Sequence, residues 1–149
     1  MSKILIQANN LDVVIDIFMF LYNHKGCNKQ DVADYCGFSL RQVDYYTNAC
    51  KYLELINDDW SFTPLGNEIF QENPAEVKER VFERIVTDEI IGKIFAHVLL
   101  FSADDIKVYS KELVKIYFPG YSETVYERRS DNMVKWCKTI IKYLKNIYG

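Results

Sequence analysis

The sequence predicts a mainly α-helical protein, built as a winged helix-turn-helix with a small β-hairpin wing and followed by a helical second half. Three observations support this class. Apolar residues recur at helical spacing along most of the 149 residues, two helical segments flank a joint at Gly37, and a hairpin pattern follows them. We therefore expect a winged helix-turn-helix domain over residues 1–72 and a helical domain over residues 73–149, with a second helix-turn-helix as one interpretation of the latter.

The first two helices are bounded by residues that favour helix ends. The first is expected between Asn10, as N-cap, and Gly26, because the apolar residues between them recur at helical spacing. Asn28 is expected to cap a short second helix, with Asp31 three residues later in near agreement with a capping box. Gly37 ends this helix.

The third helix is expected over residues 39–54. Ser39 is followed three residues later by Gln42, which is the capping-box pattern. The next apolar positions form a single stripe, which predicts that one face of this helix packs into the core. The residues of the stripe are Val43, Tyr46, Cys50 and Leu53.

The wing is expected directly after the third helix. Residues 55–57 and 60–62 have the pattern of two short strands, and Asp58 and Asp59 have the pattern of the turn between them. Pro64 suits the first turn of a further helix that runs to Phe70.

The second half has helical periodicity throughout. Helices are expected over residues 76–86, 87–101 and 110–117, and a helix of about 24 residues is expected to start at Ser122. The segments "KQDVADY" (29–35) and "KELVKIY" (111–117) share Lys, Val and Tyr, and the helices after them align with Tyr52 over Trp136 and Ile56 over Ile140. This pattern indicates a weak internal repeat, which is the basis for a tandem helix-turn-helix.

Several function classes have no support in the sequence. No two of the four cysteines have C-x-x-C spacing and the two histidines are isolated, so we expect free thiols, no metal and no cofactor. No Gly-rich phosphate loop or nucleophile motif is present. The acidic pairs at 58–59 and 104–105 are interpreted as loop acids and helix caps, and we do not expect an enzyme.

The apolar run Ile94–Phe101 is too short to span a bilayer, and the N-terminus lacks a cleavable secretory pattern. We therefore expect a cytoplasmic protein without a membrane partner.

Charge is distributed unevenly along the chain. The net charge is −3, but residues 1–56 carry −1, residues 57–106 carry −7 and residues 107–149 carry +5. An acidic middle region thus separates a near-neutral start from a basic end. Such a distribution allows local phosphate binding by a protein that is acidic as a whole.

The outer face of the third helix carries side chains suited to DNA recognition. In a helix-turn-helix, this helix enters the major groove, where Arg pairs with guanine, Gln and Asn pair with adenine, and an aromatic ring packs against a thymine methyl. Asp44 would oppose phosphate, and a solvated helix face with one exposed tyrosine is the alternative. The residues assigned to DNA here are Ser39, Arg41, Gln42, Tyr45, Asn48 and Lys51.

The last helix carries a row of cations, which we call the basic row. Asp131 is the one acid on this face, and the row would suit a DNA backbone, although a solvated amphipathic face is the commoner explanation. Arg129 lies on the apolar stripe, so a DNA contact and a structural role are equally supported for it. The members of the basic row are Arg128, Lys135, Lys138, Lys142 and Lys145.

Three stretches resemble a bacterial winged-helix domain family. They are "RQVDYYTNACKYLELI" (41–56), "FTPLGNEIF" (62–70) and "TVYERRSDNMVKWCKTII" (124–141). Glu54 stands where the family usually has glycine, and the segment 137–140 lacks the family's second tryptophan. Domains of this family are common in restriction-modification proteins, so the resemblance implies a DNA-recognition or regulatory role with catalysis supplied elsewhere.

The expected function is therefore binding of double-stranded DNA, as a recognition subunit or regulator linked to restriction-modification. A homodimer, or a separate nuclease or ATPase, is the expected protein partner. The alternative is a protein-interaction or dimerisation module, for which Tyr45, Tyr52 and Trp60 would suit an interface and the acidic middle region would suit a basic partner.

Overall fold

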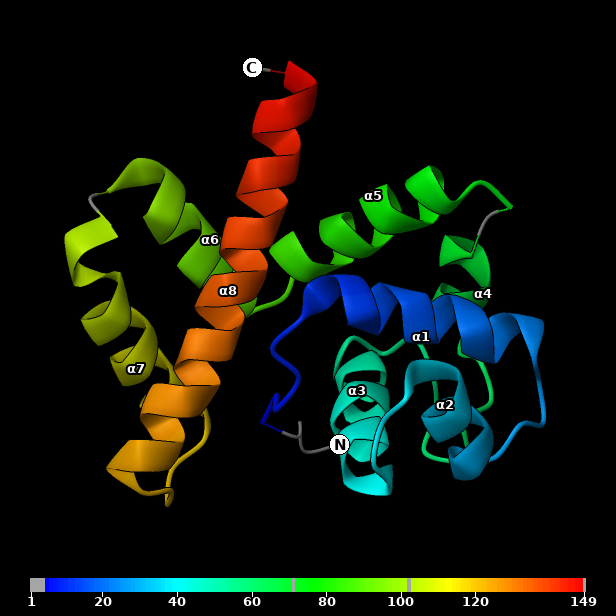
Figure 1. Ribbon diagram of the computed structural model, residues 1–149. Coiled ribbons are helices and arrows are strands. Elements are labelled where there is room, and N and C mark those ends of the chain that lie inside the picture. The colour runs from blue at the N-terminus through cyan, green and yellow to red at the C-terminus, as the bar shows by residue number, and fades with distance from the viewer. Residues whose placement is uncertain (1–4, 71, 102, 149) are drawn as a thin grey trace. The chain divides into compact units, whose positions relative to one another are not determined.

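The computed structural model describes residues 5–70, 72–101 and 103–148, which are mainly α-helical as predicted (Figure 1). The helices are α1 (Leu11–Asn23), α2 (Lys29–Cys36), α3 (Leu40–Tyr52), α4 (Pro64–Ile69), α5 (Pro74–Val86), α6 (Ile91–Leu100), the 3-10 helix η1 (Ala103–Asp105), α7 (Ile106–Tyr117) and α8 (Glu123–Tyr148). None of the described helices is long and apolar enough to cross a membrane.

The chain divides into two compact units. Unit 1 consists of Met1–Ala8 and Asp12–Val81, and unit 2 consists of Asn9–Leu11 and Phe82–Gly149. Each unit contains three successive helices with a common core, α1–α3 in unit 1 and α6–α8 in unit 2.

Unit 1 begins as the sequence predicts. Asn28 and Asp31 form a reciprocal capping box at the start of α2, and Gly37 ends this helix with a left-handed φ of 71°. Ser39 and Gln42 form a second capping box at the start of α3. A tight joint therefore connects α2 to α3, whose inner faces pack against α1. The most deeply buried side chains of these helices include Val14, Ile17, Phe18, Val32, Val43 and Cys50.

The predicted wing is wrong, because no β-strand forms among the described residues. A single antiparallel bridge joins Ile56 to Phe62, and within it the Asn57 N–H donates to the Ser61 carbonyl at 2.8 Å. The chain cannot extend this pairing, since Thr63 directly caps α4 by accepting the Gly66 N–H at 2.9 Å. Glu54 leaves α3 with a φ of 61°, the left-handed conformation that favours glycine.

Unit 2 is organised around α8. Helices α6 and α7 both pack against it, and Trp136, Cys137 and Ile140 of α8 are buried in their midst. The helix predicted over residues 87–101 instead starts at Ile91. Buried Asp88 accepts the N–H groups of Ile90 and Ile91 at 3.1 and 3.0 Å, and these bonds hold a turn before α6.

Candidate nucleic-acid interface

The first turn of α3 is held by its own side chains. The Ser39 N–H donates to Gln42 Oε1 at 3.0 Å, and the Gln42 N–H donates to Ser39 Oγ at 3.2 Å. The cap thus occupies the amide oxygen of Gln42 and leaves its Nε2 group as the donor available to a ligand. Ser39 and Gln42 therefore have a structural role at the start of α3, in addition to the DNA contact that was predicted for them.

Three further predicted residues lie on one side of α3, and we call them the recognition face. Arg41 is exposed, and its guanidinium carbon lies 5.7 Å from the ring centroid of Tyr45. Tyr45 and Asn48 are half-buried, as is Lys51 in the last turn of the helix. The ring of Tyr45 supports the guanidinium of Arg41 and favours an orientation along the helix surface. The recognition face consists of Arg41, Tyr45 and Asn48.

Asp44 is neutralised by a lysine of the preceding helix. Lys29 Nζ lies 2.8 Å from Asp44 Oδ1, and this ion pair joins the start of α2 to α3. Both side chains are more than 40% exposed, so the pair adds little stability. Its importance is electrostatic, because it compensates the one acid that would oppose phosphate beside the recognition face.

The basic row lies along α8 as predicted, with Arg128, Lys135, Lys138, Lys142 and Lys145 on the surface of the helix. Lys135 Nζ is 3.3 Å from Asp131 Oδ2, which pairs the acid that was predicted on this face. Arg129 lies on the apolar stripe of α8, a position that is compatible with either of its two predicted roles, a structural one or a DNA contact. Residues 132–148 contain four lysines and no acid, so the second half of α8 is uniformly basic.

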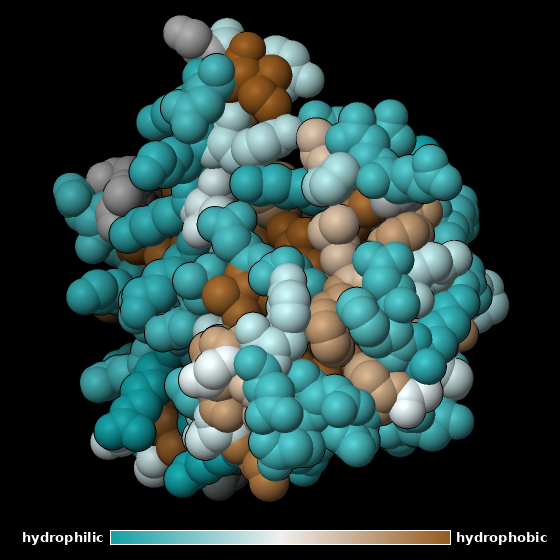
Figure 2. Space-filling view, turned by 45° about the vertical axis from the view of Figure 1, so that its right-hand side comes forward, coloured by the Kyte–Doolittle hydropathy of each residue, from teal (hydrophilic) through white to brown (hydrophobic). Residues whose placement is uncertain are grey.

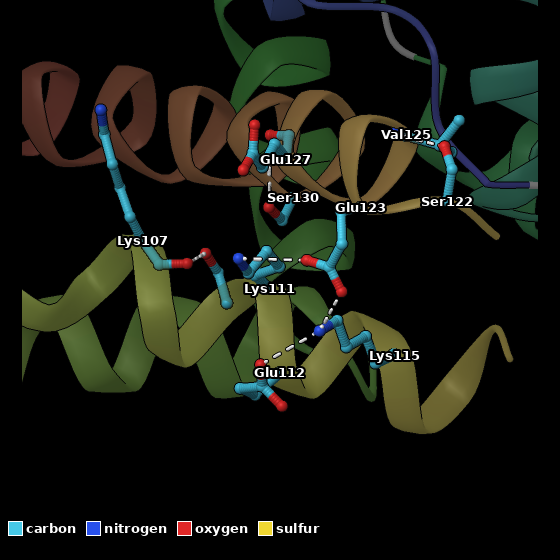
Figure 3. A network of polar contacts seen from close by, with 10 residues as sticks. Lys107, Lys111, Glu112, Lys115, Ser122, Glu123, Val125, Glu127 and Ser130 are labelled. Atoms are coloured by element: carbon cyan, nitrogen blue, oxygen red, sulfur yellow. Dashed lines mark hydrogen bonds and ion pairs between the residues drawn. The ribbon is translucent and has the colours of Figure 1, made fainter.

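The start of α8 is acidic but compensated from α7 (Figure 3). The Glu123 carboxylate forms ion pairs with Lys115 Nζ at 2.6 Å and with Lys111 Nζ at 3.3 Å. Lys115, and then Lys111, lower the pKa of the Glu123 carboxyl. Nearby, the Tyr126 hydroxyl donates to the Phe118 carbonyl at 2.6 Å, which fixes the joint between the two helices.

A matching cysteine contact relates the two units. In unit 1, Cys50 Sγ donates to the Val14 carbonyl of α1 at 3.9 Å, and in unit 2, Cys137 Sγ donates to the Ile91 carbonyl of α6 at 3.8 Å. Burial raises the pKa of both thiols to about 12. Each cysteine therefore fastens the third helix of its unit to the backbone of the first helix.

Aligning Cys50 with Cys137 brings the candidate residues of the two units into register. Without a gap, "RQVDYYTNACKYL" of α3 lies over "RRSDNMVKWCKTI" of α8. The shared residues are Arg41 and Arg128, Asp44 and Asp131, Cys50 and Cys137, and Lys51 and Lys138. This register differs from the one expected from the sequence, in which Tyr52 lies over Trp136.

The first two helices of each unit match in the same way. Aligning Val14 with Ile91 places "IF" at 17–18 over "IF" at 94–95, and Asp16 over Lys93. Asp16 accepts from the Tyr35 hydroxyl of α2 at 3.1 Å, whereas Lys93 donates to the Tyr117 hydroxyl of α7 at 2.6 Å. The pairing of Tyr35 with Tyr117 is the one that the repeated segments predicted, so the contacts support a tandem three-helix repeat.

Two aromatic residues proposed for an interface are less available than expected. Tyr52 is 3% exposed and belongs to the core, and Trp60 is half-buried.

Within the described residues, no three His, Cys, Asp or Glu side chains gather as a metal site requires. Asp59 instead accepts the N–H of Ser61 at 2.9 Å.

Sequence reasoning missed Lys29 and Lys107. The sequence shows Lys29 as a cation at the start of a helix, but its contact with Asp44 depends on how the two helices pack. Lys107 lies outside the predicted helix over residues 110–117, and α7 includes it because this helix starts at Ile106.

Comparison with known proteins identifies a family. A protein-family model described as Domain of unknown function (DUF7226) matches residues 13–145. No curated protein and no solved structure matches the chain.

Proposed function

The chain belongs to the DUF7226 family, whose description assigns no activity, and we propose from the site itself that the protein binds double-stranded DNA through α3. The observation that carries this proposal is the recognition face on the second helix of a helix-turn-helix, beside an acid that is already neutralised by Lys29. A helix in this position can enter the major groove with its N-terminal residues against base edges.

Each member of the recognition face has a distinct chemical role in this proposal. Arg41 would donate two hydrogen bonds to guanine, and Asn48 would pair with adenine. Tyr45 would support the guanidinium and contact a thymine methyl. Lys51 would neutralise a phosphate at the edge of the groove.

Unit 2 would supply most of the charge. The basic row would contact backbone phosphates, which bind lysine and arginine without regard to sequence. The resemblance to winged-helix domains of restriction-modification proteins supports a role as a recognition subunit or regulator, with a nuclease or ATPase as a separate partner. This role depends on DNA binding by this chain, so DNA binding is the property to test first.

The test is a gel-shift series with random and genomic duplexes at low and moderate salt. Arg41→Ala combined with Asn48→Ala should reduce sequence preference and leave the circular dichroism spectrum unchanged. Arg80→Ala, which removes an exposed cation of α5 in the same unit, is the matched control and should retain the preference. No binding by the wild-type protein at low salt would refute the proposal.

A second candidate function, a protein-interaction module, is favoured by exposed apolar side chains in unit 2. Leu144, Ile147 and Tyr148 continue the buried stripe of α8 beyond the core and are 37, 46 and 83% exposed. Figure 2 shows hydrophobic surface at this C-terminal end of α8, at the top of the view. Light scattering on the wild type and on Ile147→Asp distinguishes a homodimer from a monomer.

A further inference from the structure

Unit 2 contains a groove between α7 and α8 with a volume of about 510 Å³. This volume lies within the range of small-molecule sites. Both helices contribute charged and apolar side chains to it. The charged residues of the lining are Lys107, Lys111, Glu127, Arg128 and Asp131.

The repeat explains why this part of unit 2 is open. In unit 1, Lys29 and Asp44 form an ion pair from α2 to α3. Their counterparts in unit 2, Lys111 and Asp131, line the groove but bind other partners. Lys111 pairs with Glu123 in the extra first turn of α8, and Asp131 pairs with Lys135 on its own helix.

Two cations in the groove remain without a carboxylate. Among the described residues, Lys107 of α7 and Arg128 of α8 form no ion pair. Figure 3 shows the Lys107 side chain extending from α7 toward α8. Glu127 is the one uncompensated acid in the lining, so the groove has an excess of positive charge.

The neutral part of the lining restricts the ligand further. The hydroxyls of Ser110 and Ser130 donate to the carbonyls of Lys107 and Glu127 at 3.2 and 3.4 Å, so donors for a ligand come from the cations. Val108 and Val134 offer apolar surface beside them. An anion attached to an apolar or aromatic group matches this combination.

We propose that this groove binds a phosphate group, with Arg128 as the bidentate ligand and Lys107 as the second cation. Arginine suits phosphate because its guanidinium can donate two parallel hydrogen bonds. The phosphate belongs either to a free nucleotide or to the DNA backbone. For a free nucleotide the inference goes beyond the proposed function, and for the DNA backbone it rests on that function, in which Arg128 already belongs to the basic row.

The experiment follows the amide resonances of Ser110 and Ser130 in the full chain by two-dimensional NMR. The probes are inorganic phosphate, adenosine monophosphate and a short DNA duplex, each at low salt. Wild-type protein should show saturable shifts at both serines. Lys107→Gln combined with Arg128→Gln should weaken phosphate binding about tenfold or more, as the loss of charge-assisted hydrogen bonds predicts.

Two further variants keep the outcome decisive. Glu127→Gln removes the opposing acid and should strengthen binding, whereas Lys25→Gln with Arg80→Gln removes as much charge from exposed positions of unit 1 and should change affinity far less. Unmoved serine resonances with all three probes, or equal affinity in the groove variant and the wild type, would overturn the proposal.

Stronger shifts with the nucleotide than with the duplex identify a free ligand, and the reverse identifies the DNA backbone. The Arg41→Ala, Asn48→Ala variant should still bind inorganic phosphate, so failure of DNA recognition is distinguishable from failure of the groove.

Discussion

Units 1 and 2 have the same three-helix plan, but they differ in the side chains that they expose. The shared features are contacts within each unit: a buried cysteine bonded to the first helix, and a tyrosine of the second helix bonded to a charged group of the first. On the outside, Arg41, Asp44 and Lys51 have identical counterparts in unit 2, but other outer positions have diverged. Asn48 of α3 corresponds to Lys135 of α8, and Gln42 corresponds to Arg129.

In the proposed function, this difference corresponds to a division of roles within one architecture. Amide side chains can distinguish bases but carry no charge, whereas lysines bind phosphate without distinguishing sequence. In this proposal unit 1 would recognise sequence, and unit 2 would bind phosphate. Substitutions at matching positions of the two units can separate these roles.

The largest expected effect concerns core volume. Ala49 and Trp136 occupy matching positions and both are fully buried, so unit 2 fills with one large ring a position that unit 1 fills with a methyl group. Trp136→Ala should lower the free energy of unfolding by about 3–5 kcal/mol, because apolar burial decreases and a cavity remains. Urea denaturation followed by circular dichroism measures this. Trp60→Ala, at a half-buried position, is the control and should cost less; an equal cost would contradict the packing argument.

The second prediction separates charge from recognition. Changing Lys135, Lys138 and Lys142 together to Gln should reduce the slope of log K against log salt for duplex DNA, by up to about 0.9 for each phosphate that is no longer neutralised. Sequence preference should stay as in the wild type, because these positions contact no bases in the proposed function. Fluorescence anisotropy at several salt concentrations with two duplexes provides both quantities. An unchanged slope would remove the basic row from the interface.

Local features of the fold were predictable from the sequence, and tertiary ones were not. The capping boxes at Asn28 and Ser39 depend on residues three apart, so the sequence contains all of their chemistry. The predicted wing is wrong because strands need a partner of sufficient length, and the Thr63 cap ends the pairing after one bridge.

The candidate site was predictable to a similar degree. Exposure of Arg41 and of the basic row follows from helical periodicity alone. The Lys29–Asp44 ion pair and the groove beside Arg128 depend on how two helices pack, which periodicity does not determine. The register of the repeat likewise could be assigned only from the two cysteine contacts, which the sequence does not show.

The third prediction concerns the paired thiols and pH. Burial raises the pKa of Cys50 and Cys137 from 9.0 to about 12 in the folded protein. Because the folded pKa is the higher one, their contribution to stability is present below pH 9 and is lost as pH rises from about 9 toward 12. The urea midpoints at pH 7 and pH 10 should therefore lie closer together in the Cys50→Ala, Cys137→Ala variant than they do in the wild type. The Cys27→Ala, Cys36→Ala variant, at half-buried positions, should retain most of the wild-type difference.

The smallest expected effect compares the two matching aspartates. Asp44→Asn breaks an ion pair between helices and Asp131→Asn breaks one within a helix, but each pair is exposed, so each should change the free energy of unfolding by less than about 0.5 kcal/mol. Their effects on DNA should be larger than their effects on stability, since each substitution removes an acid and frees a lysine at the proposed interface. Both substitutions should increase affinity for preferred and random duplexes alike, because the freed Lys29 and Lys135 bind phosphate without distinguishing sequence. A gain that is confined to preferred duplexes in either variant, measured by anisotropy, would contradict the assignment of these lysines to phosphate.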